Sequence, residues 1–153
     1  MSGTYKTGGN AAGDARAVKF DTKIAVLVRD DLETWQRLNV TAFVVSGIAA
    51  SQPQVIGEPY EDADGTTYLS LLGQPVVVLE ADAATLKAAH TRALSRELPM
   101  SIYTGEMFTT GHDEANRSVV RAVPRDDLDL VGIAVFGPRN GVDRSVKGAR
   151  LHP

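Results

Sequence analysis

One short segment, residues 23–32, restricts the fold of this chain more than any other. It reads Lys-Ile-Ala-Val-Leu-Val-Arg-Asp-Asp-Leu, an uninterrupted apolar run that ends abruptly in charged residues. An apolar run without polar alternation is typical of a central strand with both faces covered. A helix-patterned segment, residues 34–50, follows at once. The segment therefore predicts an α/β sheet, in which ligands bind at strand-to-helix corners of this kind.

Strand and helix patterns alternate along the rest of the chain. We predict further strands at residues 74–79, 100–103 and 128–136, helices at 82–97 and 113–123, and a final helical turn at 142–146. Residues 54–72 predict a hairpin around the turn at 62–65. The alternation predicts a three-layer α/β/α sandwich with a mixed, mostly parallel sheet of four or five strands. The strands beginning near Lys23, Gln74 and Met100 should share one direction.

The first predicted helix is unusually apolar. Its helical stripe consists of Leu38, Thr41, Ala42, Val45 and Ala49, widened by Phe43, Val44 and Ile48. A helix that is apolar over so much of its circumference should pack against the sheet and against a neighbouring element as well. Thr34 is the expected N-cap, and Gly47 would allow another backbone to come close.

Length and composition indicate one globular domain. The chain has 153 residues, of which 43% are hydrophobic and 23% charged, so residues 21–153 can form a single core. Residues 1–20 are small, polar and glycine-rich, which predicts a flexible tail. The absence of cysteine excludes disulfides and thiolate metal sites, and it fits a reducing compartment.

The charge and hydropathy patterns restrict the partners. Sixteen basic and 19 acidic residues give a net charge of −3, which makes nucleic acid an unlikely partner. No apolar run approaches the roughly 20 residues that span a membrane, and we find no signal peptide, so the cytoplasm is the expected location. Three scattered histidines predict no metal site, and nothing predicts a cofactor. The expected partner is a small-molecule ligand.

Two parts of the chain resemble a known fold. The opening segment 23–32 and the closing segment Asp129–Pro138, with Val142-Asp143 and Lys147-Gly148, are similar to the type II peptidyl-tRNA hydrolases. A finer pattern looks like the uncharacterised bacterial family called domain of unknown function 2000. That pattern consists of Asn39–Phe43, Ile56–Asp62 and Tyr103–Phe108, and the resemblance covers about residues 22–153. It implies a peptidyl-tRNA hydrolase II-like fold and names no substrate.

The chain departs from the hydrolase pattern at two catalytic positions. The hydrolases begin their first helix with a lysine-containing, glycine-rich turn, whereas this chain has Trp35 and Arg37 in that region. The hydrolase aspartate after the third strand is matched here by Thr104. The resemblance therefore extends to the fold and not to the activity.

Candidate site residues cluster at two places. Arg29 and Asp31 end the first strand and could clamp an anion or act as a base, or they could form a surface ion pair beside a capped helix. Asn39 and Thr41 lie early in the apolar helix, where a buried amide or hydroxyl needs a partner. Thr41 could equally bond to its own helix backbone.

The richer cluster follows the third strand and contains Tyr103, Thr104, Glu106, Phe108 and His112. We predict catalytic roles for Glu106, Asp31 and Asn39. The predicted ligand-binding residues are Arg29, Thr41, Tyr103, Thr104, Phe108 and His112. We further expect Asn39 and Glu106 to face one cavity.

Three functions remain open from the sequence. The first is a small cytoplasmic hydrolase or transferase that acts on a small polar substrate at the carboxyl edge of the sheet. The second is a non-catalytic ligand-binding or regulatory module that uses the same cleft. The third is an assembly partner, with the apolar first helix as the face of a homodimer. A ligand located in the structure would separate these functions most directly.

Overall fold

The apolar run near the start of the chain forms the centre of a sheet. In the computed structural model, which describes residues 20–153, strand β1 (Thr22–Arg29) is buried from Ile24 to Val28. The other strands are β4 (Val76–Ala81), β5 (Met100–Thr104), β6 (Leu130–Pro138) and β7 (Arg150–Leu151), in the order β5-β6-β1-β4-β7. The tail predicted for residues 1–20 falls outside the described residues, except for residue 20.

The sheet is mixed and five-stranded. Strand β1 runs parallel to β4, and both β1 and β5 run antiparallel to β6. Strands β1, β4 and β5 therefore point in one direction, which confirms the prediction that their carboxyl ends share an edge. The expectation of a mostly parallel sheet is wrong for the pairings, because β1–β4 is the single parallel pair among the described strands and β7 also runs antiparallel to β4.

The antiparallel direction of β6 relative to β5 follows from the connection between the two strands. Helix α4 (Asp113–Arg121), which precedes it, has no buried residue and contacts mainly the turn after β5. A parallel crossover needs a helix that runs back along the sheet. Because α4 does not cover the sheet, the chain re-enters at the edge where β5 ended, and β6 pairs with β5 in the opposite direction.

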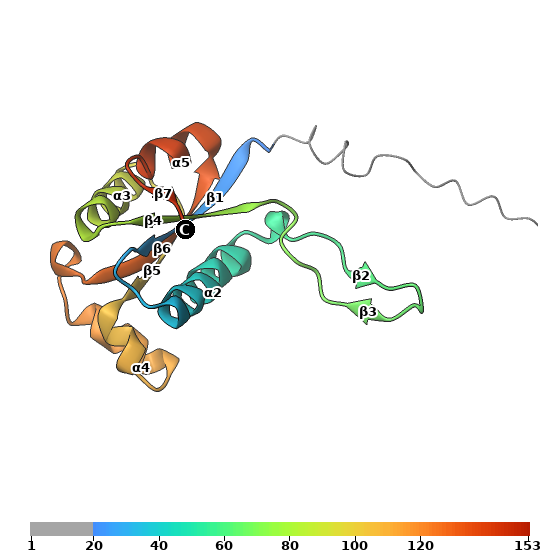
Figure 1. Ribbon diagram of the computed structural model, residues 1–153, viewed down its shortest axis with the longest axis horizontal. Helices are drawn as coiled ribbons and strands as arrows, with labels where there is room; N and C mark the ends of the chain where they lie inside the picture. The colour runs from blue at the N-terminus through green and yellow to red at the C-terminus, as the bar shows by residue number, and fades with distance from the viewer. Residues whose placement is uncertain (1–19) are drawn as a thin grey trace, which may run out of the picture.

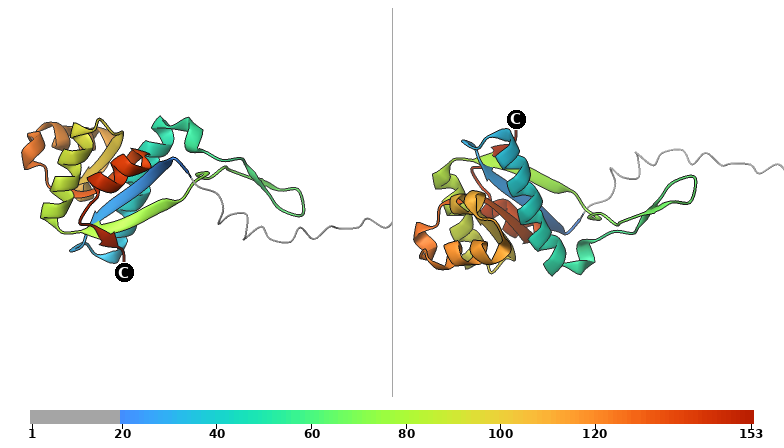
Figure 2. Two further views of the ribbon diagram at one scale, coloured as in Figure 1. Left: turned by 90° about the horizontal axis from the view of Figure 1, so that it is seen from above. Right: turned by 90° about the horizontal axis from the view of Figure 1, so that it is seen from below.

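Helices cover both faces of the sheet. Helix α2 (Thr34–Ser51) packs on one face, against β1, β5 and β6 (Figure 1; Figure 2, right). Helices α3 (Ala83–Ser95) and α5 (Arg139–Ser145) cover the other face (Figure 2, left). Each face has its own apolar cluster, so β1 is enclosed from both sides. This double burial explains why its sequence shows no alternation.

Helix α2 buries a different stripe from the predicted one, in which Leu38 and Ala42 are exposed and Thr41, Val45 and Ala49 are half-buried. Val40, Val44 and Ile48 face the sheet, whereas Leu38 and Phe43 are exposed. Apolar residues occur on all sides of this helix, so its helical period could not identify the buried side. The predicted close approach at Gly47 is confirmed, because a Cβ atom there would lie 3.0 Å from Cβ of Ser101 on β5.

The ends of the helices follow local rules with one correction. Helix α2 is capped by Glu33 rather than Thr34, and the Gln36 side chain accepts the Glu33 N–H at 2.9 Å. Asp82 caps α3, since its carboxylate accepts the Thr85 N–H at 2.8 Å. His90 of α3 lies in the core, and burial lowers the pKa of its ring.

A hairpin arm, residues 57–73, joins α2 to β4 and confirms the predicted hairpin. Its strands β2 (Tyr60–Glu61) and β3 (Thr67–Tyr68) pair antiparallel around the turn at 62–65, where Gly65 has a φ of +84°. The arm projects away from the body of the molecule (Figures 1 and 2). Its tip is exposed on both strands.

Candidate functional site

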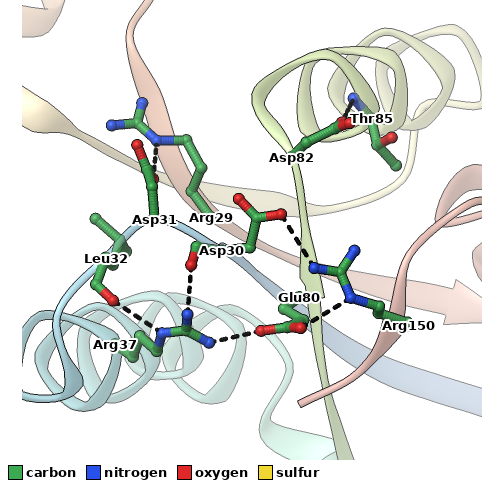
Figure 3. A network of polar contacts seen from close by, with 9 residues as sticks. All are labelled: Arg29, Asp30, Asp31, Leu32, Arg37, Glu80, Asp82, Thr85 and Arg150. Atoms are coloured by element: carbon green, nitrogen blue, oxygen red, sulfur yellow. Dashed lines mark hydrogen bonds and ion pairs between the residues drawn. The ribbon is translucent and has the colours of Figure 1, made fainter. Parts of the chain in front are cut away.

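The carboxyl ends of β1 and β4 meet in a network of charged side chains (Figure 3). Glu80, near the end of β4, is buried, and its two carboxylate oxygens pair with different arginines. Arg37 of α2 donates to one oxygen at 2.7 Å, and Arg150 of β7 donates to the other at 2.8 Å. Arg37 also bonds the carbonyl oxygens of Asp30 and Leu32. The network thus fastens the helix, two strands and the closing segment together.

The charge of Glu80 is stabilised inside this network. The hydrogen bond from Arg37 and the charge of Arg150 hold the pKa of the Glu80 carboxyl below its ordinary value, against the opposing effect of burial. Because its oxygens and most of the Arg37 donors are already occupied, the network is a structural anchor beside the site rather than a free ligand-binding group.

The predicted corner residues Arg29 and Asp31 form a surface cluster. Arg29 donates to Asp31 at 2.6 Å and to Asp129 at 2.7 Å, and the side chain of Asp31 is 63% exposed. These ion pairs correspond to the structural alternative expected from the sequence. Neither residue lines either of the two cavities that flank α2.

An aromatic cavity of about 500 Å³ lies on the other side of α2, between that helix, β5 and the segment leading into α4. Its walls carry four linked aromatic rings. Tyr103 contacts Phe108 with ring centroids 5.1 Å apart and Phe43 at 5.9 Å, and Phe108 meets Trp35 edge-on at 5.7 Å. Rings at these angles present both faces and edges, which suits a flat apolar or aromatic ligand.

Polar groups converge on the aromatic cavity as well. The Asn39 amide donates to the Tyr103 hydroxyl at 3.1 Å, which leaves its carbonyl oxygen and a second N–H unpaired by this contact. On the opposite wall, Thr110 donates to the amide oxygen of Asn116, whose NH₂ group remains available. The cavity therefore offers both hydrogen-bond donors and acceptors between its aromatic walls.

His112 has a fixed role at the edge of the aromatic cavity. It caps α4, because its Nδ1 accepts the Ala115 N–H at 3.1 Å. With Nδ1 occupied in this way, the neutral ring carries its proton on Nε2. His112 thus offers a donor, whereas a general base would need a free lone pair.

The structure brings together only part of the predicted site. Asn39, Tyr103, Phe108 and His112 all line the aromatic cavity. Thr41 lies on another side of α2 and donates to the Arg37 carbonyl, as expected for a helix-internal threonine. Glu106 is exposed on the 3₁₀ turn Gly105–Thr109 and is not part of the cavity lining, so the expectation that it faces Asn39 across one cavity fails.

Thr104 has a separate position. It is 1% exposed, and within residues 20–153 its hydroxyl oxygen has no hydrogen-bond partner. It follows a bulge in the pairing between β5 and β6, and it does not line the aromatic cavity. The predicted contact between Thr104 and a ligand therefore has no support from this geometry.

A larger cavity, of about 760 Å³, lies on the opposite side of α2. Its lining is mostly apolar and includes Val28, Leu38 and Val78, with Arg37 and the terminal residues His152 and Pro153 at its border. Glu33, Thr34, Thr41 and His152 also line this cavity, but the Arg37 guanidinium is committed to the Glu80 network and Thr41 to its own helix backbone. We assign the candidate site to the smaller cavity because it holds the convergent polar groups.

Several residues of the site escaped the sequence prediction. Thr110 and Asn116 were missed because they lie on a turn and on the polar face of a short helix, where such residues are common. Glu80 could have been found, since a carboxylate inside the apolar run Val76–Ala81 needs a charged partner.

Two further kinds of site are absent from the described residues. Within residues 20–153, no group of three or more histidine, aspartate or glutamate side chains is placed to hold a metal ion. No helix in this part of the chain is long and apolar enough to cross a membrane.

These features define a class of protein, a mixed α/β domain with an aromatic, amide-lined cavity between a helix and a sheet edge. The chain belongs to the family described as "Protein of unknown function (DUF2000)", whose model matches residues 22–153. The chain is also similar to a solved structure, the protein of unknown function Atu0240 from Agrobacterium tumefaciens strain C58. The two sequences are 50% identical over 88% of this chain and 100% of that chain, with a TM-score of 0.86. No curated protein matches this chain.

Proposed function

We propose that the domain binds a small, neutral, planar ligand carrying an amide or a similar donor–acceptor pair, in the aromatic cavity. The observation that carries this proposal is the placement of two asparagine side chains, Asn39 and Asn116, around one cavity with aromatic walls. Its volume of about 500 Å³ lies in the range of small-molecule sites. An amide ligand would pair with the free groups of both asparagines while its plane contacts the rings.

The charges around the cavity favour a neutral ligand over an anion. Among residues 20–153, its lining includes Asp113 and no lysine or arginine. Asp113 is already paired with Arg117, so an anion would find no free cation in the lining, and burying it unpaired costs free energy.

Binding has more support here than catalysis. A hydrolase or transferase, the other function expected from the sequence, would need an acid or base at the ligand. The carboxylate of Asp31 is paired with Arg29 away from the cavity, and Glu106 is exposed outside it. Asp113, which does line the cavity, is exposed and paired with Arg117. We further propose that the fold is peptidyl-tRNA hydrolase II-like, supported by helices on both faces of a mixed sheet, and that the protein acts in the cytoplasm.

A pair of matched probes tests the proposed binding. We expect nicotinamide, added to the ¹⁵N-labelled chain, to shift the side-chain amide signals of Asn39 and Asn116, with a Kd in the millimolar range that suits so small a ligand. Benzoate, an anion of similar size and shape, should shift them far less. The Asn39→Ala variant should lose the response to nicotinamide, whereas Asn140→Ala, at an exposed asparagine outside this cavity, should retain it. Equal responses to both probes, or none from the cavity asparagines, would refute the proposal.

A further inference from the structure

The outer face of α2 is apolar although it faces solvent. Trp35, Leu38 and Phe43 are 57%, 68% and 55% exposed, respectively. The sequence contains no charged residue from Leu38 to Gly57. Surface helices normally carry charged side chains on the face opposite the core, so this face has the character of a contact surface.

Side-chain size changes in a regular way along this face. The buried stripe of α2 fixes the centre of the outer face by helical geometry, at 100° per residue. The residues within about 60° of that centre line are, in order, Trp35, Leu38, Asn39, Ala42, Ser46, Ala49 and Ala50. The first half of the line is therefore bulky, and the second half is small.

We propose that two copies of this chain associate by packing α2 antiparallel against its own copy, about a twofold axis near Ala42. In such a pair, a residue that precedes Ala42 faces the residue that follows Ala42 by the same number of positions. Ala42 then meets itself, Leu38 meets Ser46, and Trp35 meets Ala49, so each bulky side chain faces a small one. A twofold contact of this kind requires one surface to be self-complementary, and this line of residues fulfils the condition.

The exposed apolar area of α2 alone is too small for a stable dimer interface, so the hairpin arm must take part as well. Aromatic side chains bury 150–250 Å² each when fully covered, so the exposed halves of Trp35 and Phe43 supply about 200 Å² together. A stable interface needs about 800 Å² on each partner. The arm adds exposed apolar side chains, namely Tyr60, Tyr68, Leu69 and Leu71.

The arm is placed to reach the second copy. It leaves from the carboxyl end of α2 and projects away from its own body (Figures 1 and 2). In the antiparallel pair, the carboxyl end of one α2 lies beside the amino end of the other. The arm of each copy therefore starts next to the bulky half of its partner's helix, where its leucines and tyrosines can be covered.

The pairing would also enclose the cavities. The outer line of α2 runs between the two cavities, since Trp35 lines the aromatic cavity and Leu38 and Ala42 line the larger one. A second helix on this line would close both cavities on their outer side. The partner copy would thus contribute a wall to the candidate site.

Two variants at the axis test the dimer. We expect the full chain to sediment as a dimer at micromolar concentration. Ala42→Arg should convert it to a monomer, because two arginines would meet at the axis. Ala42→Cys, in a chain without other cysteines, should form a disulfide-linked dimer on mild oxidation. The matched controls are Ala84→Arg and Ala84→Cys, at an exposed alanine of α3.

The oligomeric states of the parent chain and its variants decide whether the dimer forms through α2. A dimer that Ala42→Arg dissociates and that Ala42→Cys links, with both Ala84 variants behaving as the parent chain, supports the inference. A monomeric parent chain overturns it. So does a dimer that Ala42→Arg leaves intact, since its contact would then lie elsewhere. Circular dichroism identifies an unfolded Ala42→Arg variant, in which case the cysteine result decides.

Discussion

At the residue scale, the hydrogen bond between Asn39 and Tyr103 joins α2 to β5 at the candidate site. Asn39 and Tyr103 do meet at one cavity, because a polar residue in an apolar helix needs a partner and the neighbouring strand supplies one. Glu106 looked equally suitable by type and position, yet the 3₁₀ turn after β5 directs it to solvent. The direction of a turn depends on tertiary contacts, which residue type alone does not encode.

Glu80 provides a prediction about pH at this scale. Its carboxyl pKa is lower in the folded chain than its ordinary value of 4.5. The unfolded chain therefore binds a proton at a higher pH than the folded chain. The stabilisation is present above pH 4.5 and is lost as the pH falls through the folded-state pKa. We expect Glu80→Gln to lower the free energy of unfolding at pH 7 and to weaken its decline in acid.

Urea unfolding at pH 7 and in a series of buffers of falling pH, through the ordinary pKa of 4.5, measures this effect. Glu106→Gln is the matched control, because Glu106 is exposed and should change stability by less than about 0.5 kcal/mol. A Glu80→Gln variant as stable as the parent chain at pH 7 would show that the arginine network contributes nothing.

At the element scale, most strands and helices could be predicted, and their pairing could be predicted in part. The apolar runs at β1 and β4 identified the central strands, since only buried strands lack alternation. The reversed direction of β6 could not be read from its sequence, because an apolar strand looks the same in either direction. The buried side of α2 was also hidden, since its apolar residues surround the helix.

The packing of α2 on β6 predicts a sharp effect of one methyl group. A Cβ atom at Gly132 would clash with Cγ1 of Val40, whereas a Cβ at Gly111 would meet nothing within 4 Å. We expect Gly132→Ala to destabilise the chain by about 1–3 kcal/mol through overpacking. Gly111→Ala should change stability by less than about 0.5 kcal/mol. Thermal unfolding of the two variants checks this, and equal melting temperatures would contradict the packing described here.

At the scale of the whole molecule, charge and site composition together predict which reaction is absent. The net charge of −3 disfavours tRNA, whose binding depends on phosphate neutralisation. The position matched to the hydrolase aspartate is Thr104, and Trp35 lies in the turn where the hydrolases are rich in small residues. We therefore expect no release of peptide when the full chain is incubated with peptidyl-tRNA. Turnover at a rate comparable with a type II hydrolase assayed in parallel would contradict this expectation.

The central claim is that the aromatic cavity beside α2 binds a neutral planar amide. Nuclear Overhauser effects between the ring protons of nicotinamide and the protein test it most directly, because they report contacts within a few ångströms. We predict contacts from the nicotinamide ring to the side chains of Tyr103 and Phe108. Contacts confined to the larger cavity, at Val28 and Val78, would place the ligand on the wrong side of α2 and contradict the claim.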